Sequence, residues 1–125
     1  MSMMTNLEID RKLAEAMGYK ILNENFRGHL MLIDPKSHDA WGEFSYGCEW
    51  KPTESMSDAW KVAERFGLAE LKNQRYGNGR WKALMAIKHS YWFMQAEAET
   101  APLAICKAAL KVIEGSKNNA AENHL

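Results

Sequence analysis

The sequence lacks an excess of either charge. Its 16 Lys and Arg residues balance 16 Asp and Glu residues, so the formal net charge is zero. Proteins dedicated to duplex DNA usually carry a basic excess that neutralises phosphates, and the balance found here argues against that class. A run of about 18 apolar residues, the least that a membrane helix needs, is also missing. No apolar signal core stands at the N-terminus, so the sequence predicts a cytoplasmic protein with no membrane partner.

Cysteine is scarce, and metal-binding spacings are missing. The two cysteines, Cys48 and Cys106, fit a reducing compartment, and whether they pair is open at this point. No Cys-x-x-Cys motif occurs, and no histidine stands four residues from another histidine or a cysteine on a predicted helix. The four histidines are His29, His38, His89 and His124. We therefore expect no metal site and no cofactor.

A catalytic constellation is not evident either. Three carboxylates, Glu43, Glu49 and Glu54, stand in a loop-like stretch without an evident partner, and we expect them to be hydrated side chains. The turn around Asn78 is not followed by a strand-to-helix transition, so it is no phosphate-binding loop. We predict that the protein is not an enzyme. A hydrolase acting on a nucleotide signal would need acid and base residues that the sequence does not reveal.

The length and composition of the chain indicate one small globular domain. Its 125 residues are 46% apolar, which is ordinary for a folded protein. We expect a flexible leader over residues 1–6, a single domain over 7–114 and a disordered polar tail over 115–125.

Three stretches have helical periodicity with start and stop signals. Asn6 is the expected cap of the first helix, which Gly18 ends in a left-handed conformation. Ser55 and Asp58 have the spacing of a helix cap, and that helix ends before Gly67. The third helix, with Pro102 as its first residue, is apolar almost all round and is expected to be buried to residue 114.

Extended segments fill the intervals between these helices. Strands are expected over residues 19–22, 29–33, 68–74, 81–88 and 91–96, while 36–54 reads as irregular with a possible strand within 41–46. The predicted order is helix, two strands, helix, three strands, helix. This order indicates an α+β fold in which a small antiparallel sheet is sandwiched between helices.

Three local sequences carry a family resemblance. They are the stretch Ile-Asp-Arg-Lys-Leu-Ala-Glu-Ala-Met-Gly-Tyr at 9–19, Met-Ser-Asp-Ala-Trp at 56–60, and Thr-Ala-Pro-Leu-Ala-Ile-Cys-Lys-Ala-Ala-Leu at 100–110. They resemble the small phage and prophage proteins of the phage ABA-sandwich domain family, over about residues 7–114. The resemblance implies a phage origin and a sheet between helices. The matching residues are structural, so it assigns no functional residue.

Large aromatic and arginine side chains cluster in the predicted loops. These residue types dominate binding hot spots, and they also stack on bases and hold phosphates. Such rings either fill a core or lie exposed until a partner covers them. The binding hypothesis assumes that the rings in these loops are exposed. The candidate binding residues are Trp41, Tyr46, Trp50, Arg75, Tyr76 and Arg80. Two further tryptophans, Trp60 and Trp81, are expected in the core.

The functional hypothesis follows from these candidates and from the resemblance. The chain is expected to be a non-enzymatic phage accessory protein that acts by binding in the cytoplasm of an infected bacterial host. It would antagonise a host defence system by occluding a host protein or by sequestering a nucleotide immune signal, and it could form a homo-oligomer. The alternative is a nucleic-acid-binding accessory factor that uses Arg75, Arg80, Lys82 and Lys88.

Overall fold

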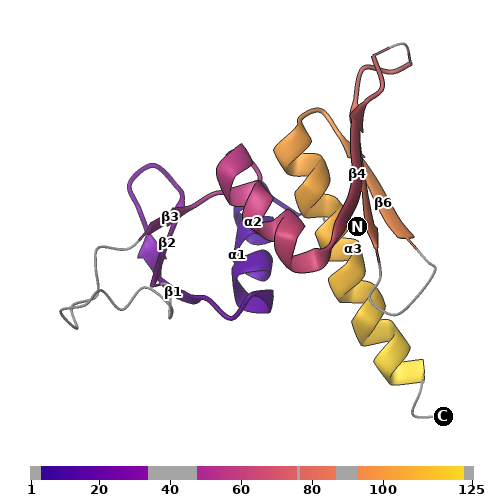
Figure 1. The fold of residues 1–125 in the computed structure, drawn as a ribbon. Coiled ribbons are helices and arrows are strands. Elements are labelled where there is room, and N and C mark those ends of the chain that lie inside the picture. Colours follow the sequence, from indigo (N-terminus) through magenta and orange to yellow (C-terminus); the bar gives the residue numbers. More distant parts are fainter. Residues whose placement is uncertain (1–3, 34–47, 76, 87–92, 123–125) are drawn as a thin grey trace. The chain divides into compact units, whose positions relative to one another are not determined.

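The computed structural model describes residues 4–33, 48–75, 77–86 and 93–122. The chain divides into two compact units, Met1–Lys51 and Pro52–Leu125. The predicted α+β class and the predicted order of elements are confirmed, with one further strand and with two three-stranded antiparallel sheets in place of one (Figure 1). The predicted single domain and leader stay predictions.

The first unit begins with α1 (Asn6–Ala16). Thr5, and not Asn6, caps this helix, because the Thr5 hydroxyl accepts the N–H of Glu8 at 3.2 Å. Gly18 ends it with a φ of 79°, as predicted, since the next N–H groups turn back to the carbonyls of the last helical turn. The face that carries Ile9 and Leu13 is buried.

Three strands follow in the first unit: β1 (Lys20–Glu24), β2 (Leu30–Ile33) and β3 (Cys48–Trp50). They pair antiparallel in the order β1-β2-β3. The predicted hairpin over the first two strands is confirmed. β3 corrects the prediction that all of residues 36–54 is irregular, since its three residues pair with β2, Leu30 opposite Trp50. The possible strand within 41–46 lies outside the described residues.

The second unit opens with α2 (Met56–Phe66). The Ser55 hydroxyl accepts the N–H of Asp58 at 3.4 Å, and Gly67 ends the helix with a φ of 83°, so both predicted signals are confirmed. Ala59, Val62 and Ala63 form its buried face. Trp60 is 50% exposed, so its predicted place in the core is wrong.

A meander of three strands forms the second sheet: β4 (Leu68–Asn73), β5 (Trp81–Ala86) and β6 (Phe93–Ala98), paired antiparallel in that order. Alternation on β5 is confirmed, because Ala83 and Met85 are fully buried while the residues between them are half-buried. Trp81, expected in the core, is half-buried.

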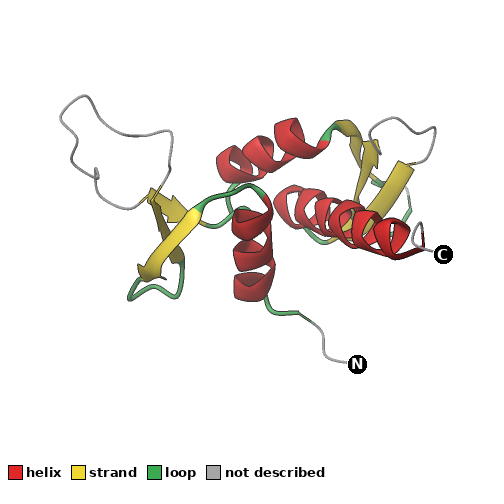
Figure 2. Ribbon diagram, turned by 90° about the horizontal axis from the view of Figure 1, so that it is seen from below, coloured by secondary structure: helices red, strands yellow, loops and turns green. Residues whose placement is uncertain are grey.

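The last helix, α3 (Ala101–Glu122), packs along this sheet and against α2 (Figure 2). Thr100 caps this helix, because its hydroxyl accepts the N–H of Leu103. Pro102, expected as the first helical residue, is the second, where its missing N–H still falls in the unpaired first turn. The buried face is confirmed, with every residue from Ala104 to Leu110 except Lys107 buried. The helix backbone continues to Glu122, so the predicted helix end at residue 114 is wrong.

Shortening a buried side chain of α3 should lower the stability of the fold. Ile105 is fully buried, so Ile105→Ala should cost about 2–5 kcal/mol in the free energy of unfolding, since it removes apolar contacts and leaves a cavity. Urea denaturation followed by circular dichroism measures this cost. The control is Glu114→Ala on the exposed side of the same helix, and an equal loss in the control would contradict the assignment of the buried face.

Candidate functional site

The six predicted binding residues fall into three groups in the structure. Trp41, Tyr46 and Tyr76 lie outside the described residues. Trp50 is buried, with 2% of its surface exposed. Arg75 is exposed and Arg80 is half-buried, both near the end of the β4–β5 hairpin.

Trp50 belongs to the core of the first unit, and its predicted exposure in a loop is wrong. Its indole N–H donates to the carbonyl of Asp10 in α1 at 2.9 Å. The ring of Tyr19 meets the indole edge-on, with centroids 5.2 Å apart and an angle of 85° between the planes. The pairing of β3 with β2 explains this burial. Trp50 stands opposite Leu30, which is itself buried, so the two side chains point to the same buried face of the sheet. The sequence analysis did not predict this strand.

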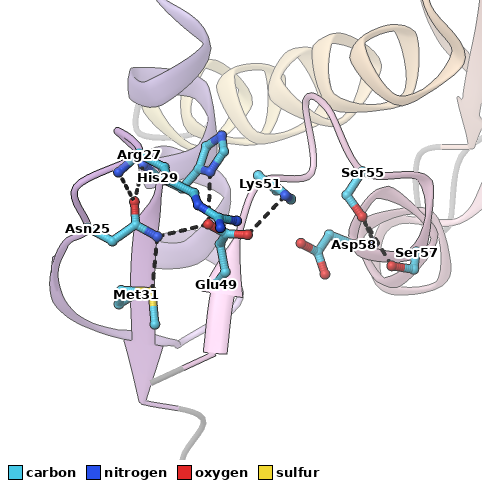
Figure 3. A network of polar contacts seen from close by, with 9 residues as sticks. All are labelled: Asn25, Arg27, His29, Met31, Glu49, Lys51, Ser55, Ser57 and Asp58. Carbon is cyan, nitrogen blue, oxygen red and sulfur yellow. Dashed lines mark hydrogen bonds and ion pairs between the residues drawn. The ribbon is translucent and has the colours of Figure 1, made fainter. Parts of the chain in front are cut away.

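Beside Trp50, Glu49 gathers polar side chains from the β1–β2 turn (Figure 3). One of its oxygens accepts from the Asn25 amide at 2.8 Å and contacts the His29 imidazole at 2.9 Å. Its other oxygen lies 2.9 Å from the ammonium of Lys51. We call Glu49, Asn25, His29 and Lys51 the Glu49 cluster.

These contacts keep Glu49 ionised. The hydrogen bond from Lys51, followed by those from Asn25 and His29, lowers the pKa of Glu49 from 4.5 to about 2. A carboxylate with so low a pKa is a poor proton acceptor at neutral pH. The Glu49 cluster therefore fixes the turn rather than offering a general base.

Sequence reasoning missed this cluster. It treated Glu49 as hydrated and without a partner, whereas the structure gives it three. Asn25 and Glu49 are 24 residues apart, and only the pairing of β3 with β2 brings them together. No spacing rule for helices or hairpins contains that signal.

A second polar group lies at the end of the β4–β5 hairpin. The amides of Gln74 and Asn78 donate to the carboxylate of Glu97 at 3.0 and 3.4 Å, and the guanidinium of Arg80 donates to the Glu97 carbonyl at 3.4 Å. Gln74 is the main cause of a lowered pKa of Glu97, and Arg80 and Lys82 add to it. The Nε of Arg80 is buried without a hydrogen-bond partner among the described residues.

Both units expose large apolar side chains. Phe26, in the β1–β2 turn, is 93% exposed, and the guanidinium of Arg27 lies 5.5 Å from its ring centroid. Trp60 on α2 and Phe93 on β6 are about half exposed. Among the described residues, no group of three or more His, Cys, Asp or Glu side chains could hold a metal ion.

Comparison with known proteins identifies the family and the fold. The family model described as the phage ABA sandwich domain matches residues 11–110. The crystal structure of a phage protein from Bacillus cereus ATCC 14579 has a TM-score of 0.64 and 20% identity, covering 91% of this chain and 92% of that chain. At that identity the likeness shows the fold alone. No curated protein matches. None of the described helices is long and apolar enough to span a membrane.

Removing the Trp50 ring should destabilise the first unit. Trp50→Ala is expected to cost about 3–5 kcal/mol in the free energy of unfolding, because it empties a buried site and removes the hydrogen bond to Asp10. Urea denaturation measures this cost. Phe26→Ala, at an aromatic ring that is 93% exposed, is the control and should change stability by less than about 1 kcal/mol. Equal effects of the two variants would contradict the assignment of Trp50 to the core.

Glu49 should contribute stability that acid removes. Its pKa is about 2 in the folded chain against an ordinary 4.5, so its contribution is complete above about pH 5 and is lost as the pH falls from 4.5 toward 2. The difference in unfolding free energy between wild type and Glu49→Gln should shrink over that interval. Denaturation between pH 2 and 6 measures it, with Glu24→Gln on β1 as the matched control. A difference that stays constant down to pH 2 would show that the ionised cluster does not form.

Proposed function

Because the chain belongs to the phage ABA sandwich domain family, we propose that it is a non-enzymatic phage accessory protein that acts by binding. The task we assign to it is antagonism of a host defence system. It would occlude a host protein or sequester a nucleotide immune signal.

The observation that carries the proposal is an exposed aromatic ring on a turn that the rest of the unit holds in place. Phe26 is 93% exposed, and covering its ring on binding is worth roughly 2–3 kcal/mol. The side-chain oxygen of Asn25 accepts the N–H groups of Arg27 and His29, both at 2.9 Å. The Asn25 amide is in turn held by Glu49.

Such pre-organisation favours a protein partner. A ring on a fixed turn loses little conformational freedom on binding, so most of the energy of covering it is available as affinity. A convex turn with a ring at its tip suits a groove on another protein better than it suits a small polar nucleotide. The neighbouring Arg27 adds a charged group of the type enriched at such contacts. Occlusion of a host protein is therefore the form of antagonism we favour.

Binding of a nucleotide or of nucleic acid through Arg75, Arg80 and Lys82 has less support. Lys82 stands opposite Glu97 in the register of β5 and β6, and Arg80 donates to the Glu97 carbonyl. The lowered pKa of Glu97 keeps a negative charge beside these cations, and that charge opposes a phosphate. Lys88, the remaining cation of this hypothesis, lies outside the described residues.

A plating assay tests the proposed function. Bacterial strains that each carry one defence system are made to express the protein and are challenged with a phage that the system blocks. We expect the wild type to restore plaque formation in at least one strain, and Phe26→Ala to abolish that rescue. Truncating an aromatic at the centre of an interface costs about 2 kcal/mol or more, roughly a thirtyfold loss of affinity.

The matched control is Glu24→Gln, an exposed change near the same turn that leaves the ring in place. It should rescue plaques as the wild type does. Thermal-shift measurements with cyclic and ADP-ribose-type nucleotides, and gel shifts at increasing salt, examine the other ligands. Rescue that survives Phe26→Ala while a nucleotide raises the melting temperature would replace occlusion by sequestration. If no strain recovers plaque formation and no nucleotide or nucleic acid binds, the anti-defence proposal is wrong.

A further inference from the structure

Among the described strands, β6 stands at one edge of the second sheet, whose order is β4-β5-β6. The hydrogen bonds of β5 show which backbone groups of β6 point outward. At one end of β5 the carbonyl of Arg80 accepts from the N–H of Gln74, and at the other end the N–H of Ala86 donates to the carbonyl of Gly67. Both contacts are on the β4 side. Because backbone direction alternates along a strand, the residues of β5 that bond to β6 are Trp81, Ala83 and Met85.

The register of β5 and β6 then identifies the outward groups of β6. The residues directly opposite those three are Ala98, Ala96 and Met94. Paired residues of this kind exchange both of their hydrogen bonds, so the backbone of these three is satisfied by β5. The residues whose N–H and C=O groups point away from the sheet are therefore Phe93, Gln95 and Glu97.

Two cationic side chains occupy outward carbonyls of this edge. The ammonium of Lys111, on α3, donates to the Gln95 carbonyl at 2.6 Å. The guanidinium of Arg80 donates to the Glu97 carbonyl, the next outward carbonyl along the strand, at 3.4 Å. A strand that adds to an edge hydrogen-bonds to the same outward groups. An added strand would therefore have to displace both cations.

The composition of β6 gives these contacts a purpose. Its sequence, Phe-Met-Gln-Ala-Glu-Ala, has one charged residue, and Phe93 is 55% exposed. An edge strand with few charges and unpaired backbone groups is a template for pairing with another chain, and proteins commonly prevent such pairing with charged side chains, lysine above all. We propose that Lys111 and Arg80 close the edge of β6 against pairing with a strand of a second copy of this chain. The second copy is the strand to exclude, because it meets this edge wherever the protein accumulates.

Removing both donors tests the proposal. The double variant Lys111→Met/Arg80→Met keeps flexible unbranched side chains but leaves the outward carbonyls without a cation. We expect it to associate at concentrations at least about tenfold lower than the wild type does, because pairing no longer displaces two charge-assisted hydrogen bonds. Sedimentation velocity over a concentration series is the measurement. The matched control is Arg11→Met/Lys12→Met, which makes the same changes at exposed positions of α1 and should associate as the wild type does.

Two further measurements distinguish strand pairing from adhesion of the new methionines. Gln95→Pro, added to the double variant, removes an outward N–H and no hydrogen bond to β5, so it should return association to the wild-type level. Circular dichroism checks that this triple variant is folded. Hydrogen exchange of the double variant needs no proline. The outward N–H groups of β6 should exchange at least about tenfold more slowly where the double variant is associated than in the wild type.

Three results would overturn the proposal. They are a double variant that associates no more than the wild type, a control that associates as strongly as the double variant, and an association that leaves the outward N–H groups unprotected. A double variant that only loses stability would show that the two cations anchor their elements to β6 and do nothing else. None of these results affects the proposed function, because Phe26 lies in the other unit and the plating assay examines it separately.

Discussion

Close packing of small side chains between α3 and the second sheet is the constraint on which this structure depends. Alanines are buried on both sides of that contact, and in the sheet Ala83 stands opposite Ala96. The buried alanines of the two layers are Ala83, Ala96, Ala98, Ala104, Ala108 and Ala109. Small residues let a helix approach a sheet closely, and such an interior has no room for a large ring without moving the backbone. Trp60 on α2 and Phe93 on β6 lie about half exposed.

The first unit differs from the second, because its core contains a large aromatic ring. Trp50 fills the space between α1 and the first sheet, with its N–H satisfied by Asp10 and its edge covered by Tyr19. The adjacent Glu49 points the other way, as neighbouring strand residues must. One short strand thus supplies a core tryptophan and the anion that organises the β1–β2 turn. Phe26 owes its fixed presentation to this division between the two faces of β3.

The two exposed apolar features have different surroundings. Phe26 stands at the tip of a turn with a single cation beside it, which fits insertion into a foreign surface. Trp60 lies on a regular helix among exposed charges of both signs.

Local chemistry made much of the fold predictable from the sequence. The cap at Ser55, the left-handed glycines at 18 and 67, the alternation along β5 and the apolar α3 all depend on residues within one or two turns of one another. These interactions act in any context, so the α+β class and the order of elements could be inferred. The family resemblance rested on the same stretches, and the family model matches them.

Tertiary structure alone decided which aromatic rings are inside. Trp50 was expected to be exposed and Trp60 buried, and both expectations are wrong, because a ring's burial depends on what the rest of the chain brings against it. The same reason hid two partners of Glu49, Asn25 and His29, which are 24 and 20 residues away in the sequence and meet Glu49 only because β3 pairs with β2. Composition and periodicity thus determined the elements and the neutral surface of this chain. Long-range strand pairing decided that Trp50 lies in the core and that Glu49 meets Asn25 and His29, since these contacts form only in the folded state.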